Sequence, residues 1–131
     1  PPLDQGNFVE PTIFDNVDPN APIACEEVFG PVLSVIPFET EQEAIEIANN
    51  TEYGLAGAVW TEDNARLHRV ASALELGDVW MNTYYRREAE MPYGGVKKSG
   101  IGQELGHEGL EEYLNTKRLC IGFDDALNPN M

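Results

Sequence analysis

Residues 54–84 read GLAGAVWTEDNARLHRVASALELGDVWMNTY and set out the architecture of this chain. Residues 54–60 are small or apolar, as is typical of a buried strand. Between Thr61 and Gly77 the apolar residues recur at the i, i+3, i+4 and i+7 spacing of one helical face: Leu67, Val70, Ala71 and Leu74. Residues 79–84 again favour a strand. The stretch therefore predicts a strand, an amphipathic helix that stops by Gly77, and a second strand.

The chain before this stretch repeats the alternation of strand and helix. Residues 8–14 and 32–38 alternate or run apolar over the length of a strand, and Gly, Pro or Asn bound them. Thr40-Glu41-Gln42-Glu43 has the form of a capping box, so we expect a helix from there to Asn49-Asn50. Strands that alternate with helices of this size form βαβ units. We therefore predict an α/β fold with a largely parallel sheet and flanking helices.

The chain after it consists of a long loop and two further elements. Residues 86–102 are rich in glycine, and loops longer than about 12–15 residues are usually functional or disordered. We favour a functional loop. Apolar residues between Leu105 and Leu114 predict a last helix, and residues 119–123 predict a last strand.

Composition limits the possible partners. The chain has 131 residues, with eight Lys plus Arg against 23 Asp plus Glu, and a formal net charge of −15. This charge repels phosphate backbones and anionic membranes, so we expect neither nucleic acid nor membrane as a partner. No stretch approaches the roughly 20 apolar residues of a bilayer span, and Pro1-Pro2-Leu3-Asp4 lacks the pattern of a signal peptide. We therefore expect a cytoplasmic protein with a single domain.

The cysteines give no sign of a metal or disulfide site. No Cys-x-x-Cys pair or histidine cluster is present, so we expect no metal. Cys25 and Cys120 are both expected to stay reduced. Two glutamates follow Cys25 directly and disfavour its thiolate form, so we reject Cys25 as a nucleophile.

Two loops combine glycine and proline with an aromatic ring and a carboxylate. The first is Glu26-Glu27-Val28-Phe29-Gly30-Pro31, and the second runs from Pro92-Tyr93-Gly94-Gly95 to Gln103-Glu104. Glycine lets the backbone approach a ligand closely, and proline fixes φ. The carboxylate can accept hydrogen bonds and the ring can stack. Such loops suit contacts to a ribose or a nicotinamide.

At these loops, and at Phe8–Phe14, Tyr53-Gly54-Leu55 and Asp78–Thr83, the chain closely resembles the aldehyde dehydrogenase superfamily. The likeness extends over nearly the whole chain and corresponds to the C-terminal part of the family's catalytic domain. The resemblance implies oxidation of an aldehyde to a carboxylic acid with NAD or NADP, in a homo-oligomer (dimer or tetramer). The family's catalytic cysteine and general-base glutamate belong to other segments, so this segment alone is expected to be inactive.

The resemblance assigns roles to four residues of the two loops. The residue matching Glu27 accepts hydrogen bonds from the ribose beside the nicotinamide, and the residue matching Phe29 packs close by. Tyr93 matches an aromatic residue at the substrate pocket. Glu104 matches a glutamate near a proton path that serves thioester hydrolysis, which is an auxiliary catalytic role. The alternatives are a strand-entry turn for the first loop, an exposed tyrosine, and a carboxylate that stabilises a helix start.

Arg87 departs from the family pattern, since many members have an aromatic residue there. In members that act on muconic-type semialdehydes, an arginine placed similarly before the Pro-aromatic-Gly-Gly turn binds the substrate carboxylate. A guanidinium suits this task because its fork presents paired donors. The resemblance thus implies that Arg87 binds a carboxylate-bearing semialdehyde. The alternative is a salt bridge from Arg87 to Glu88 or Glu90.

A second class of function stays open, in which the segment is structural and not catalytic. In the family, the matching C-terminal strand joins subunits. Residues 119–123 would then lend a strand to the sheet of a neighbouring subunit and stabilise an assembly. Whether the chain is a monomer or an oligomer in solution would help to distinguish the structural function from the catalytic one.

Overall fold

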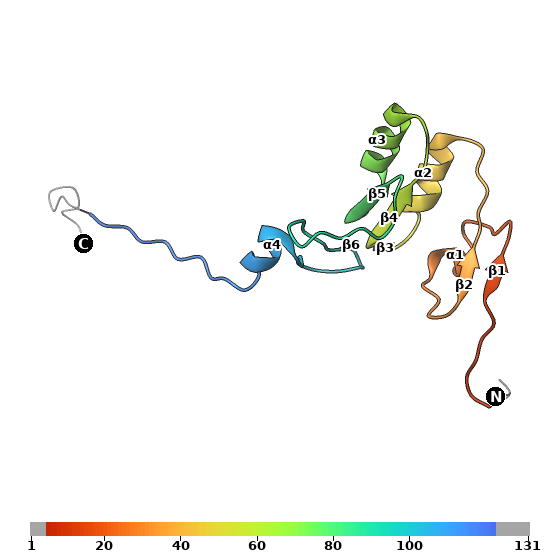
Figure 1. Cartoon of the computed structure of the whole chain (residues 1–131), viewed down its shortest axis with the longest axis horizontal. Coiled ribbons are helices and arrows are strands. Elements are labelled where there is room, and N and C mark those ends of the chain that lie inside the picture. Colours follow the sequence, from red (N-terminus) through yellow and green to blue (C-terminus); the bar gives the residue numbers. More distant parts are fainter. Residues whose placement is uncertain (1–4, 123–131) are drawn as a thin grey trace.

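A computed structural model describes residues 5–122. The elements in chain order are β1 (Thr12–Phe14), α1 (Pro22–Cys25), β2 (Val32–Ser34), α2 (Glu41–Asn49), β3 (Tyr53–Gly54), β4 (Ala56–Val59), α3 (Asn64–Ala73), β5 (Asp78–Met81), β6 (Val96–Lys97) and α4 (Gly106–Glu111). Helices α2 and α3 lie together beside β4 and β5 (Figure 1). Parallel strands connected by helices confirm the predicted α/β class.

The predicted strand, helix and strand of the central stretch are β4, α3 and β5. The two strands are parallel, with Ala56 opposite Asp78 at the start of the register. Two apolar side chains are buried within residues 5–122: Leu67 of α3 is 7% exposed and Trp80 of β5 is 8% exposed. The packed core of the described chain therefore lies where α3 covers this strand pair.

Helix α3 begins later than predicted because an aspartate caps it. The sequence pattern places the start at Thr61, whereas the helix starts at Asn64. The Asp63 carboxylate accepts hydrogen bonds from the backbone N–H groups of Ala65 at 2.9 Å and Arg66 at 3.1 Å. The hydrogen bond from Arg66 makes the largest contribution to lowering the pKa of Asp63. This cap satisfies N–H groups that have no partner inside the helix.

Helix α2 begins where the capping box predicts, and an ion-pair cluster ties it to α3. The Thr40 hydroxyl accepts a hydrogen bond from the backbone N–H of Glu43 at 3.1 Å. At the first helical residue, the Glu41 carboxylate accepts hydrogen bonds from Nε of Arg69 at 2.6 Å and Nε of Arg66 at 3.1 Å. The hydrogen bond from Arg69 makes the largest contribution to lowering the pKa of Glu41 to about 2.

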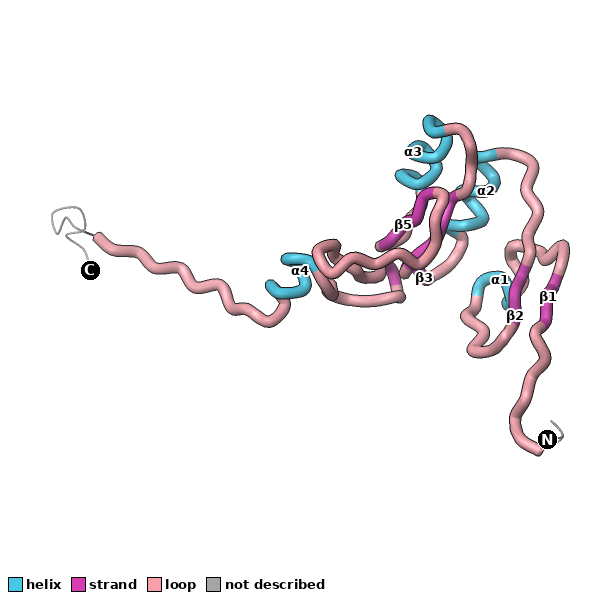
Figure 2. The backbone as a smooth tube through the Cα atoms, in the orientation of Figure 1, coloured by secondary structure: helices cyan, strands magenta, loops and turns pink. Residues whose placement is uncertain are grey.

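The strands do not join into one sheet, which is where the structure departs from the predicted arrangement. They form three two-stranded sheets, β1–β2, β3–β6 and β4–β5, of which the first and third are parallel (Figure 2). The predicted strands 8–14 and 32–38 shorten to β1 and β2. Their apolar side chains stay in contact with water, with Ile13 68% and Leu33 57% exposed. Within the described chain, the β1–β2 pair buries little apolar surface against the other two sheets, so little hydrophobic stabilisation holds it there.

Two strand ends also differ from the prediction. The long loop over residues 86–102 contains β6, which pairs antiparallel with β3. Because Gly54 pairs with β6 while residues 56–59 pair with β5, the strand predicted over residues 54–60 divides at Leu55. Strand β5 stops at Met81, since Asn82 adopts a φ of 52° and turns the chain out of the extended conformation.

The chain leaves the folded part after α4. Residues 115–122 lie outside any helix or strand and extend away from the other elements (Figure 1). The strand predicted over residues 119–123 is therefore not formed over residues 119–122, because no other described strand lies beside them to complete a ladder. Its last residue, Phe123, lies outside the described residues.

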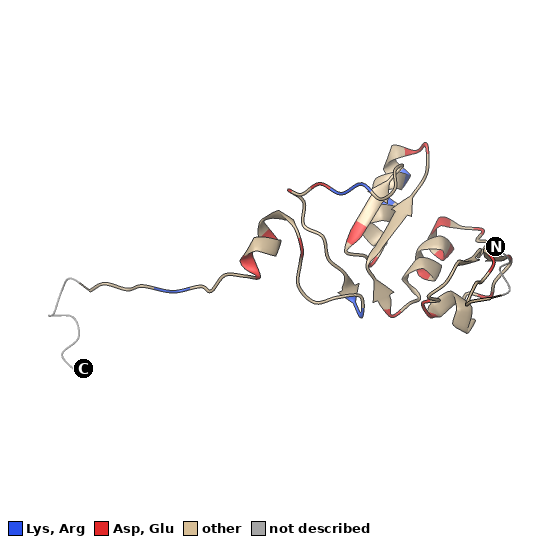
Figure 3. Ribbon diagram, turned by 60° about the horizontal axis from the view of Figure 1, so that its bottom comes forward, with Lys and Arg blue, Asp and Glu red and all other residues tan. Residues whose placement is uncertain are grey.

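The charges are dispersed over the described chain. Acidic residues lie on several helices and loops and do not gather in one segment (Figure 3). Among the described helices, none is long and apolar enough to cross a bilayer.

Candidate functional site

The first loop, residues 26–31, follows α1 and leads into β2. Glu27 lines a cavity of about 530 Å³ together with Tyr53 and Gly54 of β3 and with Lys98 and Ser99 of the second loop. Within residues 5–122 Glu27 makes no ion pair. Its carboxylate is therefore free to accept hydrogen bonds from a ligand in this cavity.

Phe29 lies in the same loop but outside that cavity. Its side chain is 93% exposed, and it is not among the residues that line the cavity beside Glu27. The described chain thus holds Phe29 only through the backbone turn, in which Gly30 N–H donates to the Val28 carbonyl at 2.9 Å. The two predicted cofactor residues share a loop, and the structure does not bring their side chains together.

The second loop is closed by a pair of backbone hydrogen bonds. Tyr93 N–H donates to the Glu104 carbonyl at 2.7 Å, and Glu104 N–H donates to the Tyr93 carbonyl at 2.7 Å. Both residues line a cavity of about 360 Å³, with glycines of the loop between them. A Cβ on Gly77 would lie 1.7 Å from the carbonyl oxygen of Gly94, so the loop rests directly on the backbone that leads into β5. The predicted pocket aromatic and the predicted auxiliary carboxylate are therefore neighbours.

The residue after Glu104 has a strained backbone. Leu105 has φ 63° and ψ −178°, a region that glycine alone occupies freely. Gly106 follows with a φ of 59°, and its N–H donates to the Ala89 carbonyl at 3.0 Å. A Cβ on Gly106 would lie 2.8 Å from the backbone nitrogen of Pro92. These close contacts fix the turn that presents Glu104 and Leu105.

Arg87 lies between two tyrosine rings. Its guanidinium carbon is 3.9 Å from the ring centroid of Tyr93 and 4.8 Å from that of Tyr85. The adjacent Arg86 takes the ion pair with Glu88, at 3.9 Å. The alternative reading of Arg87 as the salt-bridge partner of Glu88 or Glu90 therefore does not describe this structure over residues 5–122.

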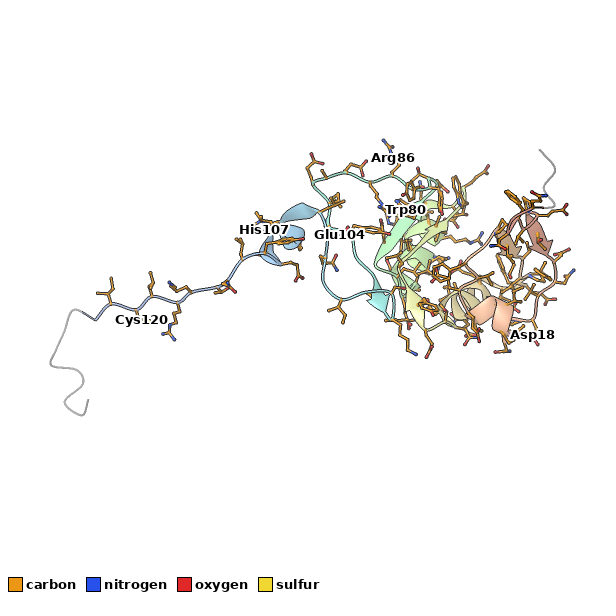
Figure 4. All side chains as sticks on the ribbon, turned by 90° about the horizontal axis from the view of Figure 1, so that it is seen from below. Asp18, Trp80, Arg86, Glu104, His107 and Cys120 are labelled. Atoms are coloured by element: carbon orange, nitrogen blue, oxygen red, sulfur yellow. The ribbon has the colours of Figure 1, made fainter. Side chains whose placement is uncertain are left out.

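A third cavity, of about 390 Å³, lies beside Arg87. Arg87, Tyr93 and Leu105 line it, and the buried Trp80 closes it on the side of β5. Trp80 Nε1 donates to the Arg86 carbonyl at 2.8 Å, which holds the start of the loop against the core. Figure 4 shows Trp80 and Arg86 close together, with Glu104 at the boundary between the strands and α4. Tyr93 lines both this cavity and the one beside Glu104.

The cavity beside Glu104 adjoins each of the other two. Ser99 and Leu55 line both the cavity that contains Glu27 and the cavity that contains Glu104. Ser99 Oγ accepts a hydrogen bond from the Gly54 N–H at 2.8 Å, which holds the second loop against β3. The structure thus brings Tyr93, Arg87 and Glu104 into adjoining cavities and places Glu27 on the far side of Ser99.

Sequence reasoning missed Tyr85 and Ser99 as site residues. Tyr85 has a φ of 55°, which turns its ring toward Arg87, and no pattern of residue types predicts that conformation. Ser99 sits in the Lys-Lys-Ser-Gly run that follows the glycine pair, which was a usable signal. Over residues 5–122 no group of three or more His, Cys, Asp or Glu side chains is placed to hold a metal ion.

Cys25, the last residue of α1, is hydrogen-bonded to the backbone of the preceding segment. Its side chain is half-buried and its Sγ donates a hydrogen bond to the Pro19 carbonyl at 3.3 Å. Cys120 is exposed on the extended segment, far from the cavities (Figure 4).

Known proteins resemble this chain over nearly its whole length. A betaine aldehyde dehydrogenase of Bacillus subtilis (strain 168) is 52% identical over 119 residues, which are 91% of this chain and 24% of that protein. A 2-hydroxymuconic semialdehyde dehydrogenase of Pseudomonas sp. (strain CF600) is 45% identical over 116 residues, 88% of this chain and 24% of that protein. The chain therefore spans about a quarter of the length of these relatives.

A solved structure and a family model agree with these relatives. The crystal structure of betaine aldehyde dehydrogenase from Staphylococcus aureus in complex with NAD+ superposes with a TM-score of 0.84 at 56% identity, covering 88% of this chain and 23% of that one. The model of the aldehyde dehydrogenase family matches residues 1–119. These matches confirm the resemblance found in the sequence: the chain belongs to the aldehyde dehydrogenase family.

Proposed function

We propose that this chain is part of an enzyme that oxidises an aldehyde to a carboxylic acid with NAD or NADP, and that another segment of the complete enzyme supplies the catalytic cysteine. The observation that carries the proposal is the cavity in which Glu27 of the first loop meets Lys98 and Ser99 of the second. Two segments far apart in sequence, both singled out by their loops of glycine, proline, an aromatic ring and a carboxylate, converge there. Convergence of this kind is expected of a binding site and not of two unrelated turns.

The cofactor fits the residues of the first loop. Glu27 offers two carboxylate oxygens free of any ion pair over residues 5–122, which suits the paired hydroxyls of a ribose. The exposed ring of Phe29 offers a flat face for the nicotinamide. The nicotinamide, when bound, accepts the hydride from the aldehyde carbon. Glu27 and Phe29 would orient it, and orientation of reacting groups lowers a barrier by several kcal/mol.

The second loop supplies the substrate side. Tyr93 walls the substrate cavity, and Arg87 presents its guanidinium there for a carboxylate at the far end of the aldehyde. Glu104 would serve as an auxiliary proton carrier in thioester hydrolysis, since it lies beside Tyr93 in the adjoining cavity. A semialdehyde is therefore the proposed substrate class, in agreement with one of the relatives.

The nucleophile would come from outside this segment. The Cys25 thiol donates a hydrogen bond to the Pro19 carbonyl, and Cys120 lies on the extended segment. We accordingly expect no aldehyde-dependent NADH formation by residues 1–131 alone. Turnover by the purified segment that is lost in Cys25→Ala would contradict this.

The role of Glu27 can be tested in the complete enzyme that carries this segment. Glu27→Gln should slow single-turnover NADH formation, or change the dissociation rate of the cofactor, by about 10- to 100-fold, equivalent to a charged hydrogen bond of about 1.5–3 kcal/mol. Stopped-flow NADH absorbance measures the first and displacement of bound NADH the second. Glu26→Gln is the matched control, because Glu26 does not line the cavity. Equal behaviour of the two variants would contradict the assignment.

The non-catalytic reading has one observation in its favour. Leu119 and Ile121 are 82% and 77% exposed on the extended segment, and residues two apart in an extended chain share a face. We infer that this face pairs with a neighbouring subunit in a dimer or tetramer. Ile121→Lys should then shift the complete enzyme toward smaller species in light scattering, whereas Asn115→Lys on the same segment should not. An unchanged mass for both would reject the pairing.

A further inference from the structure

The neighbourhood of Arg87 resembles a binding site whose ligand is part of the chain. An aromatic cage binds a cation by presenting ring faces to it, and this is how proteins recognise quaternary ammonium groups. Here Tyr93 and Tyr85 present their rings to the guanidinium of Arg87, at 3.9 Å and 4.8 Å from the ring centroids. The cation between the rings is a side chain of the protein itself.

The two walls of this cage are held independently of Arg87. Tyr85 packs against Trp80, with ring centroids 6.2 Å apart, and Trp80 is buried. Tyr84 adds an edge-to-face contact to Trp80 at 5.3 Å. Tyr93 is fixed from the other side by its two backbone hydrogen bonds to Glu104. Removal of the Arg87 side chain should therefore leave both rings in place.

The net charge of the residues that line the cavity beside Arg87 depends on Arg87 itself. The lining residues include two arginines, Arg86 and Arg87, and two acids, Asp78 and Glu88. These four charges cancel. Without Arg87, one positive and two negative groups remain, a local excess of one negative charge, and that excess favours a bound cation.

We propose that Arg87 fills an aromatic cage and makes this enzyme select against aldehydes that carry a quaternary ammonium group. This inference rests on the proposed aldehyde oxidation and names the substrate class that it excludes. A guanidinium between the rings occupies the place where such a ligand would stack, and it repels the ligand by its charge.

Two relatives are named for aldehydes of opposite charge. One relative is a betaine aldehyde dehydrogenase at 52% identity, and another is a semialdehyde dehydrogenase at 45%. Betaine aldehyde carries a trimethylammonium group, and a semialdehyde carries a carboxylate. Arg87 favours the anionic substrate for this chain, although the betaine aldehyde dehydrogenase has the higher sequence identity of the two relatives.

The test uses two aldehydes of one shape in the complete enzyme. Betaine aldehyde and 3,3-dimethylbutanal differ by the exchange of a cationic nitrogen for a neutral carbon. The ratio of kcat/KM for the cationic to the neutral aldehyde should rise at least about tenfold from wild type to Arg87→Ala, equivalent to about 1.4 kcal/mol. Arg87→Met, which keeps the length of the side chain, should also raise the ratio if the alanine variant is poorly folded.

Two matched variants separate the cage from general charge. Arg87→Lys keeps a cation between the rings and should keep the low ratio. Arg86→Ala removes the same charge one residue away and should leave the ratio within about twofold of wild type, because Arg87 still occupies the space between the two rings. An unchanged ratio in both Arg87→Ala and Arg87→Met would overturn the proposal. An equal rise in Arg86→Ala would also overturn it.

A binding measurement decides the proposal without turnover. Tetramethylammonium should give saturable heat in titration calorimetry with Arg87→Ala and none with wild type at the same concentration. Saturable binding to wild type, or none to Arg87→Ala and Arg87→Met, would overturn the filled cage. Failure of the wild type to oxidise any aldehyde with NAD or NADP would instead reject the proposed function and leave this binding result to stand alone.

Discussion

The β4–α3–β5 unit and the two glycine-containing loops are built by different means. The unit buries Leu67 and Trp80, and its helix is capped by Asp63 and tied to α2 through Glu41. The loops bury no large side chain, and Phe29 on the first is 93% exposed. They are held by backbone contacts, such as the paired hydrogen bonds between residues 93 and 104.

This difference indicates which residues stabilise the fold and which are available to bind ligands. Side-chain burial stabilises the unit, so substitutions there should change the free energy of unfolding. The loops carry the residues proposed for the cofactor and substrate on a backbone framework. Substitutions of their side chains should change ligand recognition with little effect on folding, except where the backbone itself is strained.

The largest expected effect contrasts one aromatic residue from each region. Trp80→Ala should lower the free energy of unfolding by about 3–5 kcal/mol, since it removes a buried ring and the hydrogen bond to the Arg86 carbonyl. Phe29→Ala should change it by no more than about 0.5 kcal/mol. Urea unfolding of the complete enzyme, followed by circular dichroism, measures both. Similar losses of unfolding free energy in the two variants would contradict the difference between the two regions.

A medium effect should arise from the strained residue of the second loop. Leu105→Gly should be more stable than Leu105→Ala by up to about 2.5 kcal/mol, because a strain of about 1–3 kcal/mol is offset only by the roughly 0.5–1 kcal/mol of entropy that glycine loses on folding. At Leu110, inside α4, the order should reverse. The same unfolding assay decides, and a glycine variant less stable than the alanine variant at both positions would rule out strain at residue 105.

The smallest effect concerns acid and the tie between α2 and α3. The pKa of Glu41 is about 2 in the folded chain against an ordinary 4.5, so its contribution to stability is present above pH 4.5 and is lost as pH falls through about 2. The difference in midpoint temperature between wild type and Glu41→Gln should thus shrink from pH 6 to pH 2. Other acids titrate equally in both proteins and cancel. A difference independent of pH would show that the ion pairs contribute nothing.

Much of the fold was predictable because local signals coincide with packing. The apolar period between residues 61 and 77 and the capping box at Thr40 both led to helices in the right places. Residues whose partners are close in sequence were therefore located well. The short helix α1 was not predicted, since its four residues carry no periodicity.

Sheet pairing and side-chain placement were less predictable because they depend on distant partners. The strand over residues 54–60 divides only because β6, far along the chain, pairs with Gly54. Likewise the family pattern pointed to Arg87 but could not show that Tyr85 would share it with Tyr93, since that contact depends on the left-handed backbone of residue 85. The position of Phe29 beside a cofactor stays a prediction.

The paired hydrogen bonds between Tyr93 and Glu104 have a mechanical consequence. The two backbone hydrogen bonds couple the positions of Tyr93 and Glu104, and the start of the loop that they close rests on Gly77. Pressure from a ligand on the Tyr93 ring is thus transmitted to the backbone that carries Glu104. Under the roles proposed for Tyr93 and Glu104, occupancy of the substrate pocket would then influence the hydrolytic step.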